Sequence, residues 1–264
     1  MRLSGSLAYR TPTIFETTAD SRSQVFFPGI PPFVPPSVNP GLLSGSDNLN
    51  PEKILSFDLG YQGWFLQHRL RVRGDVFYNH ISDLITSVRV STVPSVLRFV
   101  NTGGAADIHG LEAGLEYQAT PWLSGFLNYT YQHINQTITV SDVRRGAPAH
   151  KINASLRGDW TNGLNAEASL YYVSGADYPI SSTFSQFAVF PFNGPPPPGS
   201  HVDSYTLLNL RGAYRFWQQK AAAGYLREAE VAISLFNGLN DRHKEHPLGD
   251  TIGSRVLGWL TLRL

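Results

Sequence analysis

The sequence predicts an all-β protein: an antiparallel up-and-down meander of about ten strands, of the kind that forms outer-membrane β-barrels. First, apolar and polar residues alternate with a period of two in block after block, as in strands with one apolar and one polar face. Second, short and long connections between these blocks follow each other in order, as in barrel hairpins with tight turns at one end and long loops at the other. Third, only 16% of residues are charged and the chain has 24 glycines and 18 prolines, a composition that disfavours a soluble helical domain.

Each strand is predicted from its apolar face. The first, centred near residue 5, is the least regular, with Leu3, Leu7 and Tyr9. The next four, near residues 58, 74, 113 and 127, have the sets Leu55/Phe57/Leu59/Tyr61, Leu70/Val72/Val76/Tyr78, Leu111/Ala113/Leu115/Tyr117 and Leu123/Leu127/Tyr129/Tyr131. The last five, near residues 155, 169, 211, 232 and 259, have Ile152/Ala154/Leu156/Trp160, Leu164/Ala166/Ala168/Leu170/Tyr172, Leu208/Leu210/Tyr214/Phe216, Ala229/Val231/Ile233/Leu235 and Val256/Leu260/Leu262/Leu264.

The connections support a barrel. Short turns are expected near Gln67, at 119–121 and at 161–163, with a longer one at 217–227, and long loops are expected at 10–52, 82–107, 133–149, 175–204 and 238–253. Aromatic residues gather beside the short turns, as in the girdle at a membrane interface: Tyr61, Trp64, Tyr117, Trp122, Trp160, Tyr214 and Phe216. In the alternative, a soluble β-sandwich, the apolar faces would form the core, but strands this long with such asymmetric loops favour the barrel.

In a membrane barrel the apolar side chains face lipid and the polar ones face the lumen. The residues expected to point outward are Leu70, Val72, Leu115, Leu156, Leu210, Ile233 and Leu260. The lumen-facing set is Arg71, Arg73, Asp75, Arg157, Asp159 and Arg211, together with Glu116 and Arg263. Charge costs little there, so a structural reason for these residues is favoured over a transport role.

Composition excludes several classes of protein. The net charge of +1 gives no sign of a nucleic-acid partner, and the absence of cysteine excludes disulfides, thiolate metal sites and a cysteine nucleophile. There is no apolar run near Met1 of the length that a signal peptide needs, and no stretch of about 18 apolar residues that would form a membrane helix.

Catalytic and metal-binding motifs are not found, so no enzymatic activity, cofactor or metal site is predicted. The tightest histidine cluster, His243 to His246, has no zinc-helix spacing and is interpreted as a solvated loop. Two Pro-rich segments are expected to be stiff extracellular loops whose phenylalanines contact a ligand or pack on each other over the barrel mouth: Phe26, Phe27, Phe33, Phe190 and Phe192.

Five short motifs resemble, in order, the barrel of the TonB-dependent receptors of the Gram-negative outer membrane. They are LAYRTP at 7–12 with Glu16, LNPEK at 49–53, NTGG at 101–104 with GLE at 110–112, APAHKIN at 147–153 and FNGLND at 236–241. The resemblance spans nearly the whole chain. It departs from the family at the C-terminus, where Leu264 stands in place of the usual aromatic residue that helps the insertion machinery to recognise the last strand.

This resemblance implies that residues 1–264 are the C-terminal portion of a receptor barrel, without the plug domain, the TonB-contacting box or a signal peptide. Family barrels have about 22 strands, so ten make a partial barrel. We therefore expect the sheet to stay open rather than to pair its first strand with its last.

The function implied is that of an outer-membrane receptor and transporter for a scarce nutrient. Iron-siderophore complexes come first, then cobalamin or carbohydrate, and the sequence does not choose among them. Its partners would be outer-membrane lipid, the energy-coupling TonB complex acting through a plug domain, and a small-molecule or metal-chelate substrate. The alternative is a self-standing small outer-membrane barrel with a structural, adhesion or passive pore role.

Overall fold

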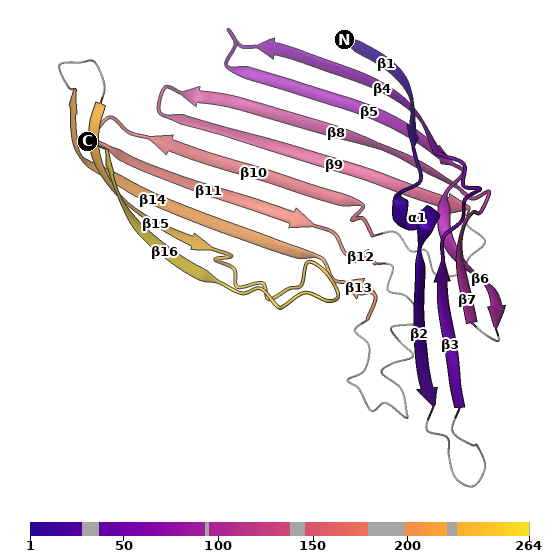
Figure 1. Cartoon of the computed structure of the whole chain (residues 1–264). Coiled ribbons are helices and arrows are strands. Elements are labelled where there is room, and N and C mark those ends of the chain that lie inside the picture. Colours follow the sequence, from indigo (N-terminus) through magenta and orange to yellow (C-terminus); the bar gives the residue numbers. More distant parts are fainter. Residues whose placement is uncertain (28–36, 93–94, 138–145, 179–198, 221–225, 264) are drawn as a thin grey trace.

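A computed structural model of the protein describes residues 1–27, 37–92, 95–137, 146–178, 199–220 and 226–263. The main element is a ten-stranded antiparallel sheet in which every predicted strand is present (Figure 1). In spatial order its strands are β1 (Arg2–Arg10), β4 (Glu52–Phe65), β5 (Leu70–Ser82), β8 (Ala105–Thr120), β9 (Leu123–Thr137), β10 (His150–Asp159), β11 (Leu164–Val173), β14 (Tyr205–Lys220), β15 (Leu226–Phe236) and β16 (Arg255–Arg263). Spatial order follows chain order, so the sheet is the predicted meander.

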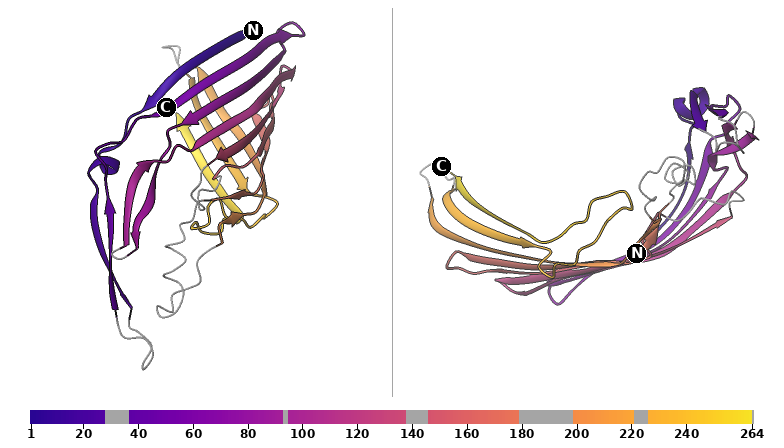
Figure 2. Two further views of the ribbon diagram at one scale, coloured as in Figure 1. Left: turned by 90° about the vertical axis from the view of Figure 1, so that its right-hand side faces the viewer. Right: turned by 90° about the horizontal axis from the view of Figure 1, so that it is seen from below.

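The sheet is curved like a trough and it is not closed (Figure 2). Each strand pairs only with its neighbours in the meander, and among the described residues no pairing joins β1 to β16. The expectation of an open sheet is therefore confirmed, and the chain does not form the ten-stranded closed barrel of the alternative hypothesis. Two edge strands remain, each with a row of backbone groups that lacks a neighbouring strand.

The long connections have more structure than the sequence suggested. The first contains α1 (Ile14–Thr18), β2 (Asp20–Phe27) and β3 (Ser37–Ser44), and the second contains β6 (Ile85–Thr92) and β7 (Ser95–Asn101). These four strands form a second sheet in the order β2-β3-β7-β6, in which β3 and β7 run parallel. A further small pair joins β12 (Ala176–Asp177) to β13 (His201–Val202). In the described part of the chain, no helix has the length and hydropathy needed to cross a membrane.

The short turns lie where they were predicted. Leu66, Gln67 and His68 connect β4 to β5 in a run of positive φ angles of 52°, 59° and 67°. Gly163, between β10 and β11, has a φ of 88°, and a Cβ at this position would clash with the carbonyl oxygen of Arg215. Glycine is the residue that adopts this conformation without strain. The turn expected over 217–227 is shorter, because β14 extends to Lys220 and β15 begins at Leu226.

The main sheet is a single layer with two distinct faces. Among the described residues, no large side chain is fully buried, whereas Leu156, Leu260 and Ile233 are 63%, 60% and 59% exposed. Cross-strand partners share a face, and the register joins the apolar sets across the sheet, for example Leu115, Leu127, Ala154, Leu170 and Leu208. An apolar surface of this extent needs a cover other than water.

A prediction concerns two glycines on neighbouring strands. A Cβ at Gly110 of β8 would clash with the carbonyl oxygen of Tyr131 and with the Phe77 ring, whereas Gly74 of β5 has no atom within 4 Å of the same position. We expect Gly110→Ala to lower the free energy of unfolding by about 1–3 kcal/mol, as overpacking does. Gly74→Ala is the matched control and should be neutral or stabilising. Denaturant titration of the two variants measures this, and equal stabilities would contradict it.

Candidate functional site

The six predicted lumen residues lie on one face of the main sheet. Arg71, Arg73 and Asp75 alternate along β5, where Arg71 is opposite Glu116 and Asp75 is opposite Glu112 on β8. Arg157 on β10 is opposite Glu167, which is opposite Arg211 on β14. The register between β8, β9 and β10 joins the two groups on the same face. We call this face the charged face.

On β10 to β16 the charged face carries a chain of ion pairs and hydrogen bonds. Arg157 binds Asp159 (Nε–Oδ2 2.8 Å), and the Asn165 amide joins Asp159 to Arg211. Arg211 then binds Glu230 (Nη2–Oε1 2.9 Å). At the far edge, Glu228 forms an ion pair with Arg215 (Nε–Oε2 3.2 Å) and accepts a hydrogen bond from Arg263. Opposite charges alternate along this chain, so this part of the wall is internally neutralised.

On β1, β4, β5 and β8 the charged face is hollowed and less completely paired. Arg2 binds Asp75 (Nη2–Oδ1 3.2 Å), and Arg71 binds Glu116 (Nη1–Oε1 3.1 Å). A hollow of about 640 Å³ is lined by Arg2, Asp58, Arg73, Asp75 and Glu112, among others. Its charged groups include two cations and three carboxylates. This part of the charged face can therefore form polar contacts with a group that enters the hollow.

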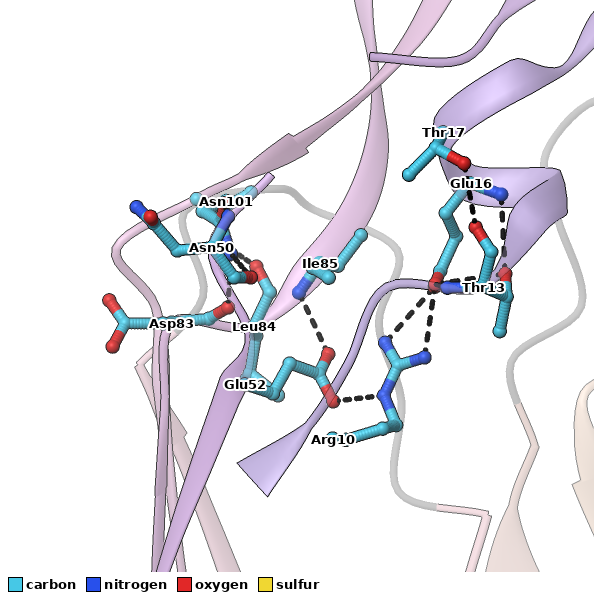
Figure 3. Close-up of polar contacts among 11 residues, drawn as sticks. Arg10, Thr13, Glu16, Thr17, Asn50, Glu52, Asp83, Leu84, Ile85 and Asn101 are labelled. Atoms are coloured by element: carbon cyan, nitrogen blue, oxygen red, sulfur yellow. Dashed lines mark hydrogen bonds and ion pairs between the residues drawn. The ribbon is translucent and has the colours of Figure 1, made fainter. Parts of the chain in front are cut away.

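The loop ends of the first strands are joined by a polar clamp centred on Arg10 (Figure 3). Its guanidinium binds Glu52 (Nε–Oε2 2.6 Å) and both oxygens of Glu16, each at 3.0 Å. The other Glu52 oxygen accepts from the backbone N–H of Ile85 at 2.8 Å. Arg10 thus links the end of β1, the start of α1, the start of β4 and the start of β6.

Glu16 also forms a capping box with Thr13 at the start of α1. Its carboxylate accepts from the Thr13 backbone N–H at 2.7 Å, while the Thr13 hydroxyl accepts from the Glu16 N–H at 3.2 Å. Close by, the side-chain amide of Asn101 donates to the carbonyl oxygens of Asn50 and Asp83. The backbone N–H of Asn50 in turn donates to the side-chain oxygen of Asn101. Arg10, Glu16, Glu52 and Asn101 belong to the motifs singled out in the sequence, so those motifs are explained by the attachment of the loops to the barrel wall.

The clamp predicts a pH dependence outside the strands. Hydrogen bonds from Arg10 and then Thr13 lower the pKa of Glu16 from 4.5 to about 2. Because the folded-state pKa is depressed, this stabilisation is complete above about pH 4.5 and is lost as the pH falls towards 2. The hydrogen-exchange protection of residues 13–18, which is the exchange rate corrected for the intrinsic pH dependence of amide exchange, should therefore fall only below pH 4.5. In Glu16→Gln the protection should already be lower at pH 7 and should change less with acid; unchanged protection at pH 7 would contradict the role of Glu16.

The phenylalanines proposed for ligand contact are only partly described. Phe26 and Phe27 lie at the end of β2, where they pair with Val38 and Ser37 of β3, so this part of the segment is strand rather than irregular loop. Phe33, Phe190 and Phe192 lie outside the described residues. Their contact with a ligand stays a prediction.

The interpretation of His243 to His246 as a solvated loop is wrong for His243. Its side chain is only 4% exposed, and its ring stacks on Tyr205 with a centroid distance of 4.1 Å. The side chains of Asn237 and Asp241 hold this loop, since Asn237 bonds the Asp241 backbone twice and Asp241 accepts from the Thr206 N–H. Both asparagines lie in the FNGLND motif, where Asn237 and Asn240 each have a φ of 51°. Lys244, Glu245 and His246 are exposed, as expected.

The contact with Tyr205 relates the charged face to the curvature of the sheet. Tyr205 alternates with Leu207, Asn209 and Arg211 along β14 and therefore belongs to the charged face. The loop between β15 and β16 that carries His243 lies over the concave side of the trough (Figure 2). In the described residues, no group of three or more His, Asp or Glu side chains is placed to hold a metal ion.

Solved structures with this fold were found, although no curated protein matches the chain significantly. The ferric-catecholate import receptor Fiu from E. coli is 13% identical, with a TM-score of 0.65 over 99% of this chain and 32% of that one. The ferric enterobactin receptor PfeA from Pseudomonas aeruginosa is 15% identical (TM-score 0.64; 98% of this chain, 37% of that one), and the copper transporter OprC is 17% identical (TM-score 0.61; 98% and 36%). The chain thus spans about a third of the length of these proteins.

Similarity to solved structures at this level of identity shows only the fold. The family is shown by a match of the sequence itself to a family model. The family described as "TonB dependent receptor-like, beta-barrel" matches residues 1–237, which is most of the chain. This match includes nine of the ten strands of the main sheet and the residues of the clamp. The chain belongs to the TonB-dependent receptor β-barrel family.

Proposed function

We propose that this chain forms the C-terminal portion of the barrel of an outer-membrane receptor that takes up a scarce nutrient with energy from the TonB complex. The observation that carries the proposal is an open ten-stranded arc, matched by the receptor family over 1–237 and covering 32–37% of the solved relatives named above. An open edge is costly in lipid, where each unpaired backbone group costs several kcal/mol. The remaining barrel strands of the full-length protein would satisfy both edges.

In this proposal the concave, charged face is the wall of the lumen. It would place Arg71, Arg73, Asp75, Arg157, Asp159 and Arg211 towards the plug and the water around it. The support is the position of the His243 loop over the concave side and its contact with Tyr205. The convex, apolar face would then lie in the lipid of a Gram-negative outer membrane, the location of this family.

The substrate class that we propose first is an iron-siderophore complex, with cobalamin and carbohydrate as further possibilities. Two of the relatives named above are ferric-siderophore receptors, which supports iron, while the copper transporter indicates that this fold also serves other cargo. The phenylalanines of the Pro-rich segments, Phe26, Phe27, Phe33, Phe190 and Phe192, are proposed to contact the substrate at the extracellular mouth. The TonB complex would act through a plug domain.

An uptake experiment tests the proposal. Cells of the source organism with and without the gene take up ⁵⁵Fe-catecholate, ⁵⁵Fe-hydroxamate, cobalamin and a maltodextrin, each in the presence and absence of the proton gradient that powers TonB. We expect uptake of one of these to require both the gene and the gradient. Uptake that requires the gene but not the gradient would favour a passive pore. Uptake of all four that is indifferent to the gene would overturn the proposal.

A further inference from the structure

The face opposite the charged face carries an apolar groove. It has a volume of about 480 Å³ and runs over β8, β9, β10, β11 and β14, with Leu115, Leu127, Ala154, Leu156, Ala168 and Leu170 among its lining residues. Ala154 lies between Leu127 and Leu170 in the register, and Ala168 is opposite Leu156. Small residues between large ones produce a furrow of the kind that a flexible hydrocarbon chain can fill.

The same strands change from apolar to polar residues towards their loop ends. Following the alternation from Leu115 along β8, the side chains on this face are Ala113, Leu111, His109 and Asp107. From Leu127 along β9 they are Tyr129, Tyr131, His133 and Asn135, and from Ala154 along β10 they are Ile152 and His150. The groove therefore ends beneath a cluster of histidines and tyrosines on one continuous face. We call His109, His133, His150, Tyr129 and Tyr131 the histidine cluster.

The histidine cluster is compact and accessible. His109 and His133 are directly opposite in the register, with ring centroids 5.2 Å apart. The His150 ring lies 5.1 Å from that of Tyr131, and its Nδ1 is 2.9 Å from the Tyr129 hydroxyl. The three histidines are exposed. Each can donate a hydrogen bond to an approaching anion.

The Asp107 carboxylate, on the same face of β8 as His109, is already engaged. Asp107 accepts from the Tyr78 hydroxyl at 2.6 Å and lies 2.8 Å from His80 Nδ1. Both contacts are made to Oδ1 of Asp107, and they reduce the repulsion that its carboxylate would exert on an approaching anion. The residues that face the cluster are thus His80 and Tyr78 on β5, Asp107 on β8, Asn135 on β9 and Ile152 on β10.

The spacing of groove and cluster matches one leaflet of a membrane. Leu115 and His109 are six residues apart on β8, which is about 20 Å along a strand and about 15 Å across a membrane at a typical barrel tilt of about 40°. This is close to half the thickness of a bilayer's hydrocarbon core, about 30 Å. A lipid whose acyl chain filled the groove would have its headgroup at the level of the histidines.

We propose that this face is a binding site for a phosphate-bearing lipid, with an acyl chain in the groove and the phosphate on the histidine cluster. The inference rests on the proposed function, which places the apolar face in the membrane. The histidines and tyrosines would donate hydrogen bonds to the phosphate oxygens, and a lipid that lacks a phosphate would be held less tightly. The site would fix one annular lipid to β8, β9 and β10.

Native mass spectrometry of the full-length protein in detergent tests this with phosphatidylglycerol and with diacylglycerol of identical acyl chains, which lacks the phosphate. We expect the wild type to bind phosphatidylglycerol about tenfold more tightly, the size of effect given by one hydrogen bond to a charged group. His109→Gln/His133→Gln/His150→Gln should remove this preference and leave binding of diacylglycerol unchanged. Ala154→Leu/Ala168→Leu, which fills the groove, should weaken both lipids. An excess of inorganic phosphate should not displace the lipid.

The control is His68→Gln, which changes a histidine in the turn at the other end of the strands and should keep the preference. Unchanged circular dichroism and thermal midpoint establish that each variant is folded, and His133→Gln alone is the fallback if the triple variant is not. Equal binding of the two lipids by the wild type, or a preference that survives in the triple variant, would overturn the site. Failure to retain any lipid would count instead against the membrane placement in the proposed function.

Discussion

Leu156→Arg is expected to lower the free energy of unfolding in lipid by about 2–4 kcal/mol, the cost of arginine at the midplane of a membrane barrel. Leu156 is 63% exposed and lies on the apolar face of β10, opposite Gly125 and Ala168. In water an arginine at so exposed a position would cost little, so the predicted loss arises from the hydrocarbon around it. Guanidinium titration of the full-length protein in phospholipid vesicles measures the change.

Asn153→Arg is the matched control, because Asn153 is an exposed residue of the same strand on the charged face. If that face borders the lumen, the added arginine should change stability by less than about 1 kcal/mol. The account would be contradicted by the reverse order, in which Asn153→Arg is the more destabilising variant. If both variants lowered the free energy of unfolding by the same small amount, neither face would lie in lipid.

Glu52→Ala is expected to have the second largest effect, a loss of about 2 kcal/mol. The carboxylate has a side-chain exposure of 12% and accepts from both the Arg10 guanidinium and the Ile85 N–H. Its removal leaves that N–H without its acceptor and Arg10 with Glu16 only. The loss should be concentrated at the loop end of β1 and β4, so hydrogen exchange should accelerate in α1 and β6 before it does in β10 or β11.

Asp47→Ala serves as the control, since Asp47 is an exposed carboxylate in the segment that leads into β4. It should leave both stability and exchange unchanged. Glu52→Gln keeps the shape and one acceptor and should fall between the wild type and Glu52→Ala. An alanine variant that unfolds like the wild type would show that the clamp is not what attaches the loops.

The sequence was sufficient for the main sheet because membrane strands are long and two-faced. Ten or more alternating residues in β4, β5, β8 and β11 leave one register that keeps every apolar side chain on one face. The second sheet was missed because its strands lie in the long connections, outside the main sheet in which residues alternate between an apolar and a charged face. The segment of β3, for example, reads SVNPGLLS, with proline and glycine in the middle and no period of two. It pairs along its length with β2, and its second half also pairs with β7, a partner more than fifty residues away.

The site was predicted in its parts but not in its assembly. Arg10, Glu16, Glu52 and Asn101 were found as family motifs, yet only the fold shows that three of them share one network, because their contacts span 42 residues of sequence. The charged face followed from alternation alone. The burial of His243 could not, since it depends on Tyr205 and on the turn of Asn237, neither of which leaves a periodic pattern.

The central claim is that the convex, apolar face meets lipid and the concave, charged face lines a polar lumen. Because the chain contains no cysteine, spin labels can be attached at six consecutive positions of β10, from Ile152→Cys to Arg157→Cys, without removing native thiols. Accessibility of each label to oxygen, which concentrates in lipid, and to a water-soluble nickel chelate is then measured in the full-length protein in vesicles. We predict that oxygen is the better relaxant at 152, 154 and 156 and the nickel chelate at 153, 155 and 157. The opposite phase, or no alternation at all, would contradict the claim.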